Sequence, residues 1–183
     1  MGIIRSHRRG SATLEFTLVG IPLMFMLISI FEMARGMWTY HTLAYAVKEG
    51  TRYAVVHGQN SSSHATYQSI CNRIVSAGTG LISQDLAVSF TSGSFTSASS
   101  ATGPYCAGSS CANGFSTCPT TSWPPSGEDH PGQYITVSAY YPFVSALSMF
   151  WPGKTKGLNF KMLTCTGGST VCLPAASSDA MQY

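Results

Sequence analysis

The stretch Arg8-Arg9-Gly10-Ser11-Ala12-Thr13-Leu14-Glu15-Phe16 opens the part of the chain that decides its fold. A basic leader meets a glycine, and a run without charged residues follows from Phe16 to Phe31. Residues 11–14 extend this run toward the N-terminus, so that Glu15 is its one interruption. About 20 apolar residues suffice to cross the hydrocarbon core of a bilayer. We therefore expect a membrane-spanning helix that starts close to Gly10.

Glu15 is the most unusual residue of this run. An ionisable side chain costs roughly 2.5–3.5 kcal/mol at the bilayer centre and usually faces a partner. If the chain is cut after Gly10, Ser11 gains a free amine one helical turn, about 6 Å, before Glu15 and on the same face. An α-amino group is mostly charged at neutral pH, so the two groups could pair within one chain or between packed helices. The alternative is a carboxylate that reaches the cytoplasmic interface of the membrane.

This pattern resembles the cleavage site of type IV prepilins, in which a basic leader, a glycine, a glutamate and an aromatic residue precede an apolar helix. Residues 31–38 (FEMARGMW) and 48–58 (KEGTRYAVVHG) narrow the match. They are similar to the TadE-like family, the minor pilins or pseudopilins of the tight-adherence (Tad/Flp) pilus machinery. The specific resemblance covers residues 8 to 58.

The resemblance implies a role in pilus assembly, as an initiating, priming or tip subunit. A membrane-embedded prepilin peptidase would cut the Gly10–Ser11 bond, with Glu15 and Phe16 completing the processing motif and Glu15 serving assembly. The implied partners are this peptidase, other minor and major pilins of the Tad system, the inner-membrane assembly platform and the lipid bilayer. The chain would be a substrate of the peptidase and no enzyme itself.

Three parts follow along the chain. We expect a cytoplasmic leader at 1–10, a membrane-spanning and then amphipathic helix at 11–57, and an extracytoplasmic α+β domain at 58–183. The basic leader places the N-terminus in the cytoplasm, so we expect the chain to cross the inner membrane once and its domain to be periplasmic or extracellular. The protein would either stay anchored in this membrane or enter the pilus. A secretory signal peptide is the alternative, but no small-x-small cleavage site follows the apolar run.

The outer part of the helix has apolar residues at spacings of three and four, which predicts its buried face. These residues are Met33, Met37, Tyr40, Ala44, Val47, Thr51 and Ala54. Glu32 can pair with Arg35, and Glu49 with Arg52. Trp38 and Tyr40 could anchor the helix at the membrane surface or pack under the domain. Pro22 is expected to bend the membrane half.

The domain is expected to hold a helix at 65–77, with Tyr67, Ile70, Ile74 and Val75 inward, and three strands. In each predicted strand, apolar side chains alternate with others and so share one face. They are Leu86, Val88 and Phe90 in residues 85–91, and Ile135, Val137 and Ala139 in residues 133–141. Residues 158–162 show the same alternation. Pro142 is expected to end the second strand, and the tail from 167 to 183 to be irregular. The predicted fold is a pilin-like α+β fold, in which the long helix packs against a small antiparallel sheet.

All six cysteines lie beyond the membrane segment, at Cys71, Cys106, Cys111, Cys118, Cys165 and Cys172. An even number in an extracytoplasmic domain favours disulfides, and the sequence does not choose among their pairings. A metal site is the weaker alternative, because the spacing is not that of a zinc motif. Three of the cysteines lie in the Ser- and Gly-rich segment 92–132 and are expected to staple it. The same segment contains Tyr105, Phe115 and Trp123. These side chains either pack on their own domain or contact a partner, as in a membrane-tethered binding module or tip adhesin.

Charge and motifs exclude other classes of protein. Only 9% of the residues are charged, and the formal charge of +3 comes from Arg5, Arg8 and Arg9 in the leader, so no nucleic-acid partner is indicated. No nucleophile elbow, zinc-protease motif or phosphate-binding loop is present. The acidic cluster Glu128-Asp129-His130 is explained by a solvated loop. We therefore expect a structural protein without a cofactor or metal, and a tethered enzyme is the weakest alternative.

Overall fold

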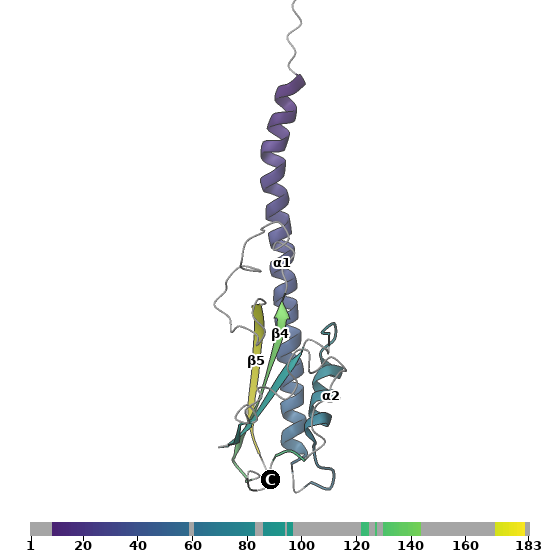
Figure 1. Ribbon diagram of the computed structural model, residues 1–183, viewed down its shortest axis with the longest axis vertical. Helices are drawn as coiled ribbons and strands as arrows, with labels where there is room; N and C mark the ends of the chain where they lie inside the picture. Colours follow the sequence, from purple (N-terminus) through teal and green to yellow (C-terminus); the bar gives the residue numbers. More distant parts are fainter. Residues whose placement is uncertain are drawn as a thin grey trace, which may run out of the picture.

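The computed structural model describes most of the N-terminal half of the chain and two long strands near its end. The described residues are 9–58, 61–82, 86–93, 95–96, 122–124, 127, 130–143 and 171–181. The first element, α1 (Arg9–Val56), is a single helix of 48 residues that continues through Pro22. At about 1.5 Å per residue it is about 72 Å long. It stands as a rod whose C-terminal half carries the rest of the described structure, as Figure 1 shows.

A second helix, α2 (Tyr67–Ala77), packs beside the end of α1. Its N-terminus is fixed by a capping box: the Thr66 hydroxyl accepts from the Ser69 N–H at 3.1 Å, and the Ser69 hydroxyl accepts from the Thr66 N–H at 2.9 Å. These bonds satisfy backbone donors that a helix start leaves unpaired. Three of the four side chains predicted to face inward are buried, and Val75 is partly buried against the same core.

The sheet is antiparallel and has the strand order β2-β1-β4-β5. Its strands are β1 (Ala87–Ser92), β2 (Phe95–Thr96), β4 (Tyr134–Phe143) and β5 (Val171–Ala180). Figure 1 shows β4 and β5 running alongside α1. The α+β fold, with a long N-terminal helix against a small antiparallel sheet, is therefore as the sequence predicts.

The alternation read from the sequence decides which side of β1 and β4 is buried. Val88 and Phe90 of β1 are buried, as is Leu86 just before it, and Ile135, Val137 and Ala139 are buried on the neighbouring β4. Phe90 is paired with Val137, so both alternating sets face the same side. They form one core with residues of α1, with α2 and with Trp123.

The end of the chain differs from the prediction. The tail expected to be irregular forms β5, which pairs with β4 over ten residues from Tyr134↔Ala180 to Phe143↔Val171. Pro142 does not end β4 but lies opposite Cys172 inside the ladder. The β1 pairing ends at Tyr140, so beyond it β4 has β5 as its only neighbour within the described ranges, and proline is tolerated at such an edge. The strand predicted at 158–162 lies outside the described residues.

The buried face of α1 is also displaced from the predicted one. Val47, Thr51 and Ala54 are buried as expected, but Met33 and Met37 are 59% and 61% exposed. Tyr40 is 43% exposed, and Leu43, Ala46 and Gly50 are buried in addition. The packed face instead begins at Gly36, where a β-carbon would lie 3.5 Å from the ring of Phe143. Small residues let the sheet approach this side of the helix, and a pattern of large apolar residues does not reveal them.

The two predicted ion pairs have different outcomes. Arg35 and Glu32 are 3.2 Å apart, as expected, and the Arg35 guanidinium lies 5.0 Å from the centre of the Phe143 ring. Glu49 pairs with Arg73 of α2 at 3.1 Å rather than with Arg52. The reason is the close approach of the helices at the neighbouring Gly50, which brings the Arg73 side chain within reach.

Candidate processing and assembly site

The residues of the predicted cleavage site lie at the very start of α1. The helix begins at Arg9, so Gly10 and Ser11 belong to its first turn. The N–H groups of a first turn have no acceptor within the helix. The Gly10–Ser11 bond therefore lies where unwinding the helix costs the fewest hydrogen bonds.

Glu15 lies one turn further along, and Phe16 follows it. The helical backbone places Glu15 about 6 Å along the axis from Ser11 and on the same face. Both Glu15 and Phe16 are exposed, Phe16 to 76%. The geometry thus allows a carboxylate and a new N-terminal amine to meet, either within the chain or across a helix contact.

The helix around this site is uncovered by the rest of the described structure. From Leu14 to Phe31 the large hydrophobic side chains, Ile28 apart, are 45–76% exposed. The Thr17 hydroxyl donates to the carbonyls of Thr13 and Leu14 at 3.2 and 3.0 Å, so this polar group is satisfied within the helix and does not require water. By length and composition, α1 can cross a membrane.

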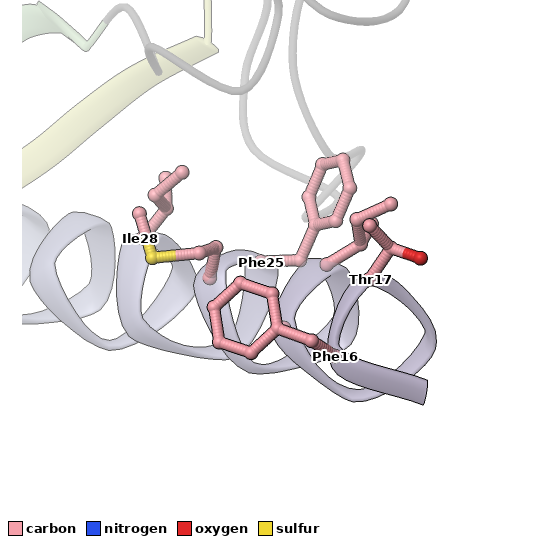
Figure 2. A pocket seen from close by; sticks show the side chains of 7 residues that line it. Phe16, Thr17, Phe25 and Ile28 are labelled. Carbon is pink, nitrogen blue, oxygen red and sulfur yellow. The ribbon is translucent and has the colours of Figure 1, made fainter. Parts of the chain in front are cut away.

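A shallow hollow of about 290 Å³ lies on this part of α1, next to the processing motif. It is centred on Gly20 and bordered by Phe16, Met24, Phe25 and Ile28, among others. Figure 2 shows the rings of Phe16 and Phe25 standing out from one stretch of helix, with Thr17 and Ile28 at its ends. This hollow is not predicted from the sequence, although Gly20 between Phe16 and Phe25 is the signal that marks it.

The cysteines are placed only in part. Cys71 is buried in α2, and Cys172 belongs to β5. Cys106, Cys111, Cys118 and Cys165 lie outside the described residues, so disulfide bonding stays a prediction. In the described ranges, no three His, Cys, Asp or Glu side chains gather where a metal could bind.

Of Tyr105, Phe115 and Trp123, the three aromatic residues considered as partner contacts, Trp123 is described by the structure. It is fully buried and contacts Tyr67 and Phe90, with ring centres 5.1 and 5.5 Å away. Of the two predicted roles, Trp123 therefore packs on its own domain. Tyr105, Phe115 and the acidic residues Glu128 and Asp129 lie outside the described residues.

Comparison with known proteins adds one finding. A family model described as TadE-like protein matches residues 10–52. No curated protein and no solved structure matches the chain. The matched segment begins at the predicted cleavage glycine and lies wholly within α1, so the likeness concerns the helix rather than the sheet.

Proposed function

We propose that this chain, a TadE-like protein of the Tad system by the match of its residues 10–52, is a minor pilin or pseudopilin cut by a prepilin peptidase. After cleavage it takes part in assembling an adhesion pilus, by initiating, priming or capping the filament. TadE-like pilins are generally structural proteins rather than enzymes. A single apolar N-terminal helix fits a single-pass membrane protein of a pilus system.

The observation that carries this proposal is the place where the match begins. It starts at Gly10, one residue after the start of α1, and continues along the exposed helix. A peptidase must bring the scissile backbone into its active site, and glycine has no side chain to obstruct that approach. Because the bond lies in the first turn, the enzyme can unwind it without disturbing the remainder of α1.

Glu15 gives the cleaved product its role in assembly. A carboxylate held in lipid is costly unless it meets a partner. The amine of Ser11 on an adjacent helix would satisfy it and, because both groups lie at fixed positions on their helices, would set how far neighbouring subunits are shifted along the filament. The uncut chain has no amine at Ser11, so it would be held out of the filament until it is processed.

Cleavage can be tested with a matched pair of glycine substitutions in cells that contain an active prepilin peptidase. Gly10→Val places a branched side chain at the scissile bond, and we expect it to retain the leader. Gly20→Ala is the control, because a β-carbon there meets nothing nearer than Phe16 at 3.9 Å, and we expect it to be cut normally. N-terminal sequencing of both proteins decides between the outcomes; cleavage of Gly10→Val to the wild-type extent would contradict the proposal.

The alternative function, a membrane-tethered binding module or tip adhesin, rests on the segment 92–132. Of its three candidate contact residues, Trp123 is buried in the domain and is not available to a partner. No observation within the described ranges favours this alternative over assembly.

A further inference from the structure

A line of side chains runs along α1 at intervals of seven residues. It consists of Thr17, Met24, Phe31, Trp38 and Tyr45, and we call it the heptad line. Its four large members are exposed to 57%, 72%, 70% and 61% in that order. Seven residues make nearly two turns, so the line drifts by only about 20° at each step and forms one continuous strip.

The heptad line lies on the opposite side of α1 from its own domain. The domain contacts the helix at Gly36, through Phe143, and at the buried Leu43. Trp38 comes two positions after Gly36, and Tyr45 two positions after Leu43. Two positions correspond to a rotation of about 200° around the helix axis, so Trp38 and Tyr45 point away from the domain. Among the described residues, the strip is therefore open from Thr17 to Tyr45.

Lipid cannot cover all of this strip. The apolar run ends at Phe31, and Tyr45 lies 14 residues further on, or about 21 Å along the helix axis. The headgroup layer extends only about 5–8 Å beyond the hydrocarbon core on each side. Met24 and Phe31 can thus lie in the bilayer while Tyr45 stands outside it. Contiguous exposed apolar surface of this kind marks a site for another protein.

The spacing and shape of the strip fit a second helix. Apolar residues that recur every seven positions keep one face of a helix turned toward a neighbouring helix in a left-handed supercoil. The hollow at Gly20 lies on the same strip, between Thr17 and Met24, where it permits close approach within the bilayer. A parallel helix anchored in the same membrane could therefore contact the strip from the hollow to Tyr45.

The charges beside Tyr45 argue against a second copy of this chain. Lys48 and Arg52 are exposed, and within the described ranges neither forms an ion pair. The nearest acid, Glu49, is held by Arg73 of α2. Two copies aligned in parallel would bring the cations of one against those of the other, which is unfavourable. A chain with carboxylates at this level would instead be attracted.

We propose that the heptad line binds the apolar helix of a different membrane-anchored chain, which carries carboxylates level with Lys48 and Arg52. This inference rests on the proposed function in one respect, namely that the partner is a co-anchored subunit of the same assembly. It goes further in assigning the face used, the parallel orientation and the charge of the partner.

Photocrosslinking of the full chain in its own membrane tests this assignment. A benzophenone amino acid replaces Trp38 or Tyr45, and Tyr134 is the control, because it is 68% exposed but lies at the start of β4. We expect adducts from Trp38 and Tyr45 to map, by mass spectrometry of crosslinked peptides, to residues seven apart in one apolar helix of a different chain. Tyr134 should not give this adduct. Adducts of Tyr45 with lipid or with a second copy, or no adduct at all, would overturn the inference.

A charge test uses two double variants that change the net charge equally. We expect Lys48→Gln with Arg52→Gln to lower the Tyr45 adduct about threefold to tenfold, as loss of two exposed ion pairs would. Ser62→Glu with Ser63→Glu, in an exposed loop, should leave it unchanged. Equal yields in all three proteins would refute the acidic partner.

The same membranes separate this inference from the proposed function. If the chain starts at Ser11 and pili form, but no helix adduct is found, the heptad line is not a docking site and the pilin role stands. If the leader is retained in the presence of the peptidase, the pilin role fails whatever the adducts show.

Discussion

The two halves of α1 use their surfaces in opposite ways. Residues 12–31 are rich in large hydrophobic side chains, and these are mostly exposed, whereas residues 36–56 bury Leu43 and Val47 together with small residues such as Ala46 and Gly50. Hydrophobicity alone therefore does not mark where this helix packs on its own domain, because small residues make up part of the packed face. Within the described structure, the inner half of α1 is thus uncovered, and the outer half holds the domain. Changes in one half should leave the function of the other intact.

The largest effect is expected from Glu15→Ala in the inner half. Without the carboxylate, the Ser11 amine has no partner, so we expect surface pili to be almost absent. Cleavage and the unfolding of the domain should be unchanged, because Glu15 lies outside the core. Pilus counts by electron microscopy measure the effect, and Glu15→Asp, which keeps the charge, should restore part of it. Normal counts for Glu15→Ala would remove Glu15 from assembly.

Phe90→Ala tests the opposite case, a change in the domain that should affect its stability. Phe90 is fully buried and packs edge-on against Tyr67 at 5.2 Å between ring centres. Truncating a buried phenylalanine costs about 3–5 kcal/mol, so the free energy of unfolding should fall by that amount. Phe25→Ala, at a position 47% exposed in the inner half, should leave it within error of the wild type. Denaturant unfolding in detergent measures both; equal losses would mean that the two halves of α1 are not independent.

A smaller effect distinguishes two glycines of the outer half. A β-carbon at Gly50 would overlap Cγ1 of Ile74, so Gly50→Ala should cost about 1–3 kcal/mol of unfolding free energy through overpacking. At Gly36 the nearest atom would be 3.5 Å away, an ordinary contact. Gly36→Ala should therefore be neutral or stabilise by up to about 1 kcal/mol, because alanine favours the helix. The opposite order would show that α2 does not pack closely on α1.

The smallest effect concerns the ion pair between α1 and α2. The Glu49 and Arg73 side chains are 27% and 52% exposed, and exposed pairs contribute only about 0.2–1 kcal/mol. A double-mutant cycle of Glu49→Gln and Arg73→Gln should give a coupling energy in this range that falls as salt is added. A coupling energy near zero at low salt would indicate that the pair does not link the helices.

The sequence predicted the elements whose burial follows a regular period. The alternation of Val88 and Phe90, or of Ile135 and Val137, identified two strands because one face of each is buried. The strand Val171–Ala180 was missed because its small and polar residues carry no such alternation, and its pairing with β4 depends on the tertiary fold. The face of α1 was misplaced for a related reason: Gly36 contacts the sheet, and a glycine adds nothing to a hydrophobic pattern.

The sequence was sufficient to predict a processing motif at residues 10–16 but not the features of α1 that surround it. Gly10, Ser11, Glu15 and Phe16 lie within seven consecutive residues, so a local helix suffices to arrange them. The hollow at Gly20 was missed because it arises from the shape of the side chains around a glycine and not from any polar motif. The Glu49–Arg73 pair joins residues 24 positions apart and needed the packing of two helices to be known.

The intact mass of the mature chain, extracted from membranes that contain an active prepilin peptidase, tests the central claim most directly. The account predicts a polypeptide that starts at Ser11, with the ten leader residues removed. A chain that keeps Met1, or one that starts at any residue other than Ser11, would contradict it.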